Sequence, residues 1–260
     1  MPSFQLSQIS AANGGMTPRS LPECSAVKIF TFGAVSHSSR TLDRNEVHVW
    51  RIQLNNRQEK VSELLPVLSA DERARASRYR LDRHRIDFIQ SRAALRSILG
   101  AYVGVRAADV EFRYGQHGKP QLALAIGESK VRFNFSRREA LALVAITYDR
   151  EVGVDLEFVR DDFPIFEVAE VIFSQAELEA LHRLPQEQRF EGFYNCWTRK
   201  EAYVKALGQG LSFPLKQFDV SLNPTEAARL LRVDPDQAGG WMLHDLQIDE
   251  NYIAALVVSR

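Results

Sequence analysis

A short apolar segment that carries two acids is the first part of the sequence able to do chemistry. Residues 153–157 read GVDLE. In a β-strand alternate side chains share a face, so Asp155 and Glu157 would lie side by side. Two adjacent carboxylates raise each other's pKa, and a divalent cation with oxygen ligands relieves their repulsion. An ordinary strand with its acids in solvent gives the same pattern, and this segment alone favours that simpler interpretation.

A second segment combines an acid with two lysines and a tryptophan. Residues 197–205 read WTRKEAYVK. On a helix Trp197, Glu201 and Lys205 follow one another at intervals of four and share a face, with Lys200 close to Trp197. An acid flanked by lysines suits a site that holds both a metal and a phosphate. The alternative for this segment alone is a surface Glu–Lys pair, worth about 0.2–0.5 kcal/mol.

Together the two segments resemble the diagnostic pair of the 4′-phosphopantetheinyl transferase superfamily. That pair is a strand of pattern G-[IV]-D-[IVL]-E and, further along the chain, a helix of pattern W-x-x-K-E-[AS]-x-x-K. Here they begin at Gly153 and Trp197, and Gly208–Leu211 adds the Gly-x-Gly-Leu that follows them in the family. The first part of the chain also resembles the family in a Y-G-x-x-G-K-P turn, an N-[ILF]-S segment and a basic helix, at residues 114–120, 134–136 and 68–96.

The resemblance covers about residues 45–260 and implies both a fold and a reaction. The implied fold is α+β, with two similar halves of one chain related by a pseudo-twofold axis, as in the Sfp-type pseudodimeric monomers. The implied enzyme moves the 4′-phosphopantetheine arm of coenzyme A to a serine hydroxyl of an apo carrier protein. The carrier would be an acyl, polyketide or peptidyl carrier, and the other product is adenosine 3′,5′-bisphosphate.

The resemblance also assigns roles to the acids and lysines. It implies that Asp155, Glu157 and Glu201 hold Mg²⁺, or Mn²⁺ in its place. Glu201 or a water on the metal would deprotonate the serine hydroxyl, and Lys205 would neutralise the leaving phosphate. Glu201, Lys205 and Asp155 are therefore the implied catalytic residues.

Positive charge suited to coenzyme A is concentrated in the first half. Residues 71–96 hold eight arginines against four acids, although most of these arginines fit an ordinary solvated helix face. Arg85 and Arg92, seven residues apart on one side of the predicted helix, are the better candidates for phosphate contacts. With the family motifs included, the predicted coenzyme A contacts are Arg85, Arg92, Lys119, Pro120, Ser136, Arg137, Lys200 and Lys205.

One departure from the family pattern leaves a second hypothesis open. Where the family has Ser-His-Ser, this chain has Ser136, Arg137 and Arg138. Arg137 keeps a cation that can bind phosphate but cannot act as a neutral imidazole. The alternative is therefore a catalytically impaired module that keeps the fold and binds coenzyme A or a nucleotide. The intact acids and lysines favour the active enzyme.

Elements in a repeated order must position these residues. Ser69 with Glu72 and Ser174 with Glu177 are capping boxes 105 residues apart, each preceded by a strand and followed by helices and further strands. The predicted helices cover residues 69–102, 167–184 and 190–207, and the predicted strands cover residues 47–54, 110–114, 131–135, 141–148, 152–158, 218–222, 241–247 and 253–258. We expect two α+β halves, residues 45–150 on the coenzyme A side and residues 151–260 with the metal and catalytic residues. Residues 1–44 form a peripheral or partly disordered extension, in which residues 25–36 could add a strand.

Composition limits the class of protein. The 260 residues include 33 basic and 33 acidic side chains, so the formal net charge is zero. This balance argues against a general binder of nucleic acid or of membrane surfaces, and the longest apolar runs are too short for a transmembrane helix. Two distant cysteines and the lack of a signal pattern indicate a reducing, cytoplasmic location. We expect a cytoplasmic monomer that binds coenzyme A and a carrier protein.

Overall fold

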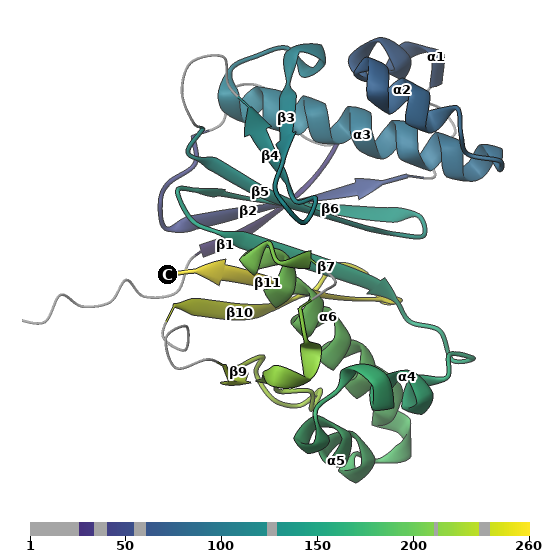
Figure 1. The fold of residues 1–260 in the computed structure, drawn as a ribbon, viewed down its shortest axis with the longest axis vertical. Helices are drawn as coiled ribbons and strands as arrows, with labels where there is room; N and C mark the ends of the chain where they lie inside the picture. The colour runs from purple at the N-terminus through teal and green to yellow at the C-terminus, as the bar shows by residue number, and fades with distance from the viewer. Residues whose placement is uncertain (1–25, 34–40, 55–60, 124–128, 211–212, 234–239) are drawn as a thin grey trace, which may run out of the picture.

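The computed structural model describes residues 26–33, 41–54, 61–123, 129–210, 213–233 and 240–260. Two β-sheets lie in the middle of the molecule, and helices lie at its two outer ends (Figure 1). The predicted α+β class is confirmed. Leu211 of the Gly-x-Gly-Leu segment and residues 1–25 of the predicted extension lie outside the described residues. None of the helices in the described ranges combines the length and apolarity that crossing a membrane requires.

The first half of the chain builds a four-stranded sheet with the strand order β1–β2–β6–β5. Its helix α3 packs on one face of this sheet through a buried apolar cluster, and α1 and α2 pack against α3. The strands of the sheet are β1 (Ala26–Thr31), β2 (Glu46–Gln53), β5 (Val131–Arg138) and β6 (Leu141–Tyr148). The helices are α1 (Val61–Leu64), α2 (Ala70–Ala76) and α3 (Asp82–Val103), followed by the hairpin of β3 (Glu111–Tyr114) and β4 (Pro120–Ala123). The added strand expected within residues 25–36 is β1, which pairs parallel to β2.

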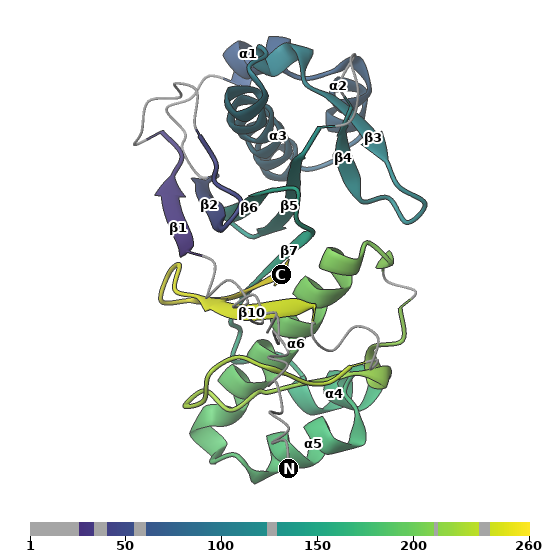
Figure 2. The same cartoon turned by 90° about the vertical axis from the view of Figure 1, so that its left-hand side faces the viewer.

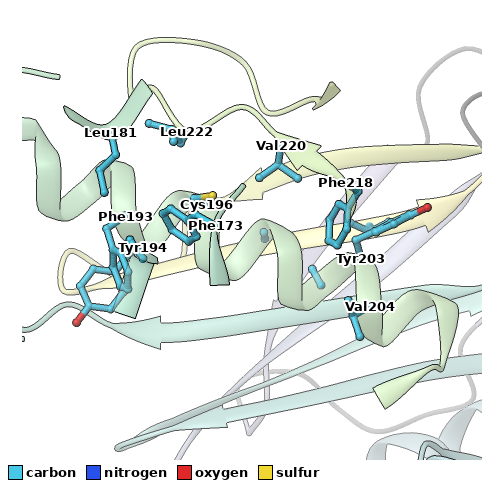
Figure 3. Packing of buried hydrophobic residues seen from close by; sticks show 14 of the residues in the cluster. Phe173, Leu181, Phe193, Tyr194, Cys196, Tyr203, Val204, Phe218, Val220 and Leu222 are labelled. Carbon is cyan, nitrogen blue, oxygen red and sulfur yellow. The ribbon is translucent and has the colours of Figure 1, made fainter. Parts of the chain in front are cut away.

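The second half builds a three-stranded sheet with the order β10–β11–β7. Its strands are β7 (Val152–Phe158), β10 (Trp241–Leu246) and β11 (Tyr252–Ser259). Its helices are α4 (Ile165–Ile172), α5 (Gln175–Arg183) and α6 (Arg189–Leu207), followed by the short strands β8 (Asp219–Val220) and β9 (Leu230–Arg232). Helix α6 is the centre of this half, because its aromatic and aliphatic residues pack against α4, α5 and the following segment (Figure 3).

The two halves repeat one arrangement of elements. The strands β2, β6 and β5 form an antiparallel unit with the same order as β7, β11 and β10. Both predicted capping boxes are present, at Ser69 before α2 and at Ser174 before α5. Both long helices, α3 and α6, end at a glycine in the left-handed conformation, Gly104 and Gly208. The two halves are therefore similar in the order and pairing of their elements, as the sequence predicts.

A buried ion pair is repeated as well. The capping-box acid Glu72 pairs with Arg96 of α3 at 2.6 Å, and its counterpart Glu177 pairs with Lys200 of α6 at 2.8 Å. Each cation also donates to the backbone just after a short 3₁₀ helix, to the carbonyl oxygens of Val110 (2.7 Å, from Arg96) and Phe218 (2.6 Å, from Lys200). In each half the buried pair therefore links the capping-box helix, the long helix and the segment after the 3₁₀ helix.

Strand β7 is buried on both sides, because its alternate residues enter two different cores. Val152, Val154 and Leu156 join an apolar cluster shared with β2 and β6 of the first sheet. The residues between them face α6, which lies very close at Gly153. A Cβ atom at Gly153 would meet the carbonyl oxygen of Ala202 at 2.0 Å and the backbone nitrogen of Ala206 at 2.4 Å. The glycine of the GVDLE segment is therefore a packing requirement.

The close packing at Gly153 predicts a large effect of one methyl group. We expect Gly153→Ala to lower the free energy of unfolding by about 2–3 kcal/mol, because the new Cβ meets backbone atoms of α6 that cannot turn aside. Urea unfolding followed by circular dichroism measures the change. Gly115→Ala is the matched control, since a Cβ there meets its nearest atom at an ordinary 3.7 Å. Equal stability of the two variants would contradict the packing argument.

Candidate active site

Two of the three predicted acids, Asp155 and Glu157, lie on β7, the edge strand of the second sheet, and the third, Glu201, lies on α6. In the described structure the outer edge of β7 pairs with no strand and is instead contacted by side chains from both halves. The amide oxygen of Asn134 on β5 accepts a hydrogen bond from the N–H of Val154 (3.0 Å). Lys119 and Lys205 donate to the carbonyl oxygens of Val152 (3.2 Å) and Val154 (3.4 Å). The edge of β7 is thus the place where polar side chains of the two halves converge.

Asp155 is the centre of this convergence. The residue is only 4% exposed, so the simpler interpretation of a solvated strand face is wrong. Its Oδ1 accepts from Lys205 Nζ (2.5 Å) and from Ser136 Oγ (2.9 Å), and Lys205 also contacts the Ser136 hydroxyl at 3.2 Å. The structure therefore brings together three residues predicted from three separate motifs.

Two further acids stand beside Asp155 in an unfavourable electrostatic environment. Burial, together with the charge of Asp155, raises the pKa of Glu157 to about 7 in spite of the nearby cations Arg138 and Lys205. Burial and the charge of Asp155 also raise the pKa of Glu201, while Lys205 opposes this shift. Both carboxylates are costly to ionise in this arrangement, and additional positive charge would relieve that cost.

The three carboxylates have the chemistry of a divalent-cation site. The Oδ2 atom of Asp155 is buried and has no hydrogen-bond partner among the described residues. Hard oxygen donors of this kind are the ligands that Mg²⁺ prefers. In the described part of the chain, however, no three or more His, Cys, Asp and Glu side chains are close enough to hold a metal. Two of the acids are instead paired with cations of the chain, Asp155 with Lys205 and Glu157 with Arg138.

Strand β5 supplies a row of contacts that the sequence interpretation did not include in the site. Asn134, Ser136 and Arg138 share one face of β5 because side chains alternate along a strand. They contact Val154, Asp155 and Glu157 of β7 respectively, in the same order along both strands. Neither Asn134 nor Arg138 was predicted as a site residue. The alternation through Ser136 could have indicated both, since it places them on the face that carries the hydroxyl.

The hairpin of β3 and β4 brings Lys119 to the same place. It extends from the first half towards α6 (Figure 2). Lys119 Nζ pairs with Glu151 (2.9 Å) and donates to the carbonyl oxygen of Ala206 in the last turn of α6 (3.0 Å). Pro120, the first residue of β4, stands opposite Tyr114. Lys119 therefore bridges the halves beside Lys205, and its contact with coenzyme A stays a prediction, as does that of Pro120.

The arginines predicted on α3, Arg85 and Arg92, have different ion-pair partners. Arg92 pairs with the buried Glu72 at 2.5 Å, and its guanidinium lies over the ring of Phe112 at 4.8 Å from the centroid. Arg85 is on the surface, where it pairs with Asp82 at 2.9 Å. Arg92 thus belongs to the same buried network as Arg96. The phosphate contacts of Arg85 and Arg92 stay predictions.

Arg137 lies on the face of β5 that is opposite to Ser136 and Arg138. Its charge acts on Asp87 of α3: burial raises the pKa of that carboxyl, and Arg137 is the strongest of the cations that lower it. Although they are neighbours in the sequence, Arg137 and Arg138 therefore interact with different acids, Asp87 and Glu157 respectively. A phosphate contact of Arg137 stays a prediction.

The structure places Lys200 in the core, a position that does not favour its predicted contact with coenzyme A, which stays a prediction. Lys200 is 1% exposed, and its ammonium pairs with Glu177 and donates to the carbonyl oxygens of Leu215 (2.8 Å) and Phe218. All of its hydrogen-bonding capacity is therefore used inside the core. Lys200 holds α6 to its neighbours, and of the two predicted lysines on this helix only Lys205 reaches the acids.

A groove of about 1190 Å³ lies elsewhere, between the first turns of α6 and the connection of β10 to β11. Asp155, Glu157, Glu201 and Lys205 are not among its lining residues. We place the site at the carboxylates, because shifted pKa values and convergent charged side chains are better indicators of chemistry than cavity volume.

The raised pKa of Glu157 predicts a pH dependence of stability. Burial holds the folded pKa of Glu157 at about 7, above the ordinary value of a glutamate. The stability that this carboxyl contributes is therefore fully present below pH ~4.5 and is lost as the pH rises through about 7. We expect the wild type to lose several degrees of melting temperature relative to Glu157→Gln over this interval. Thermal unfolding between pH 4.5 and 8 with a chelator present measures it, and parallel curves for the two proteins would contradict the assignment.

Comparison with known proteins identifies the family of this chain. A family model described as the 4′-phosphopantetheinyl transferase superfamily matches residues 151–257, the part that contains β7 and α6. The 4′-phosphopantetheinyl transferase HetI of Nostoc sp. is 41% identical over 219 residues, which are 84% of this chain and 90% of that protein. The 4′-phosphopantetheinyl transferase Sfp of Bacillus subtilis is 25% identical and is matched over 87% of its length. The chain is therefore a member of the 4′-phosphopantetheinyl transferase superfamily.

Proposed function

We propose that this protein transfers the 4′-phosphopantetheine arm of coenzyme A to a serine hydroxyl of an apo carrier protein and releases adenosine 3′,5′-bisphosphate. The observation that carries the proposal is the cluster of Ser136, Asp155 and Lys205, with Glu157 and Glu201 beside it, where the two halves meet. The superfamily membership supports the same reaction. Because both halves are present in one chain, we propose that the protein acts as a monomer. We also propose that it acts in the cytoplasm and binds no nucleic acid.

We propose that Asp155, Glu157 and Glu201 hold Mg²⁺, with Mn²⁺ as a substitute. Such an ion neutralises charge on the pyrophosphate of coenzyme A when it is bound. The unpartnered oxygen of Asp155 and the raised pKa of Glu157 support this assignment. Coenzyme A would lie against the first half. Lys119, Arg137 and, at the surface, Arg85 would contact its phosphates as cations, and Ser136 would offer a hydroxyl.

The transfer step requires a base and a cation near the leaving group. The serine oxygen bonds to the β-phosphorus of coenzyme A as the bond from that phosphorus to the bridging oxygen breaks. Glu201, or a water that the metal would hold, accepts the hydroxyl proton. Lys205 neutralises the charge that develops on the departing phosphate, which requires its ammonium to exchange the Asp155 oxygen for a phosphate oxygen.

We also propose the domain division given by the sequence, residues 45–150 and 151–260, with residues 1–44 as a peripheral extension. The repeated strand order supports the boundary between the halves, since β6 ends at Tyr148 and β7 begins at Val152. In this division the first half faces the nucleotide, and the second half supplies the acids and Lys205.

A specific observation favours a second function, a module that binds coenzyme A without turnover. Arg138, which stands where the family pattern has serine, pairs with the proposed ligand Glu157. Calorimetry with coenzyme A and intact-mass analysis of a panel of apo carrier proteins distinguish the two functions. Binding without any mass gain of a carrier would favour the module, and a gain of one phosphopantetheine would exclude it.

The proposed roles predict the effect of two substitutions. We expect Asp155→Asn and Lys205→Ala each to reduce the transfer rate by about 100-fold or more, since they remove a metal ligand and the cation for the leaving group. Intact-mass analysis of an apo carrier with coenzyme A and Mg²⁺ measures the rate. Lys130→Ala is a control for loss of a lysine, because Lys130 is half-exposed and lies in an ion pair with Asp149. Undiminished transfer by both folded variants would exclude the mechanism.

A further inference from the structure

Arg138 places a permanent positive charge on one of the proposed metal ligands. Its Nε donates to Glu157 Oε2 across a distance of 2.9 Å. An arginine stays protonated at any physiological pH, so this cation does not leave by losing its proton. The positive charge beside Glu157 is therefore present in the metal-free site at any physiological pH.

The contact follows from the fold of β5. Arg138 is the last residue of the strand and shares a face with Ser136, which contacts Asp155 in the same way. Its neighbour Arg137 projects from the other face, towards the helix that carries Asp87. Only one of the two arginines that replace the usual His-Ser can therefore reach Glu157.

The two members of the pair differ in exposure. The side chain of Glu157 is 13% exposed, whereas that of Arg138 is 43% exposed. Glu157 is held in the site by the strand, while the guanidinium lies at its rim and can move into solvent. The pair can therefore open without any rearrangement of β7.

We propose that Arg138 competes with the divalent cation for Glu157 and so lowers the affinity of the site for metal. The inference rests on the proposed function, because it takes Glu157 as a metal ligand. A carboxylate oxygen that accepts a charge-assisted hydrogen bond from a guanidinium offers less electron density to a metal. Metal binding must either displace Arg138 or rely on Asp155 and Glu201 alone.

A titration with Mn²⁺ alone, without coenzyme A, tests this competition. Mn²⁺ takes the same oxygen ligands, and its free form is counted by electron paramagnetic resonance. We expect Arg138→Ser to bind Mn²⁺ about three- to tenfold more tightly than the wild type, the gain expected when a partly exposed ion pair no longer opposes the metal. Arg137→Ser removes the same charge one residue away, and we expect its dissociation constant to equal that of the wild type.

A double variant makes the test specific for Glu157. In a Glu157→Gln background the replacement of Arg138 by serine should no longer change Mn²⁺ affinity, because the group that couples the arginine to the metal is gone. Equal or weaker Mn²⁺ binding by Arg138→Ser, or an equal gain from Arg137→Ser, would overturn the inference. So would a gain that persists in the Glu157→Gln background.

The failure of this inference can be told apart from a failure of the proposed function. Equal Mn²⁺ affinity of the wild type and Arg138→Ser, together with normal transfer to a carrier, overturns only the competition. Tighter binding by Arg138→Ser together with no transfer to any carrier supports the competition and overturns the proposed activity. No Mn²⁺ binding by any variant overturns the competition and removes the metal from the proposed mechanism.

Discussion

The site depends on the close approach of helix α6 to strand β7 at Gly153. The helix backbone occupies the space that any side chain at this position would fill. Because Gly153 shares its strand face with Asp155 and Glu157, the same approach sets these acids against the face of α6 that carries Glu201 and Lys205. A wider separation of helix and strand would take Lys205 Nζ out of contact with Asp155, now 2.5 Å away.

The edge position of β7 explains why the charges meet here. An unpaired strand edge must find partners for its N–H and C=O groups. In this protein Asn134, Lys119 and Lys205 supply them, so side chains that complete the backbone hydrogen bonds also surround the acids. The stability of the junction between the halves and the geometry of the site therefore rest on the same contacts. The zero net charge of the chain hides this concentration of paired charges at one seam.

The two halves use equivalent positions for different purposes. A shift of 105 residues relates Trp50 and Ile52 of β2 to Asp155 and Glu157 of β7. In the first half both positions are buried and join the apolar core against α3. In the second half the same strand face carries acids against α6. The buried ion pairs of Glu72 and Glu177, by contrast, are kept in both halves and serve the fold. The two halves thus share one framework, and only the second has acids at these two strand positions.

The sequence by itself determined the family and most of the elements. The features that determined them depend on local spacing, which can be recognised from the period of a strand or a helix. They are the alternating strands, the two capping boxes and the segments around Gly153 and Trp197. The predicted helices 69–102 and 167–184, however, are each divided, into α2 with α3 and into α4 with α5. Tertiary structure alone decided which charged side chains are available to a ligand. Lys200 and Lys205 belong to one motif, yet Glu177 from α5 buries the first, and Arg138 was found at Glu157 only through the packing of β5 on β7. A cation's partner is set by elements far away in the sequence, and local spacing contains no information on them.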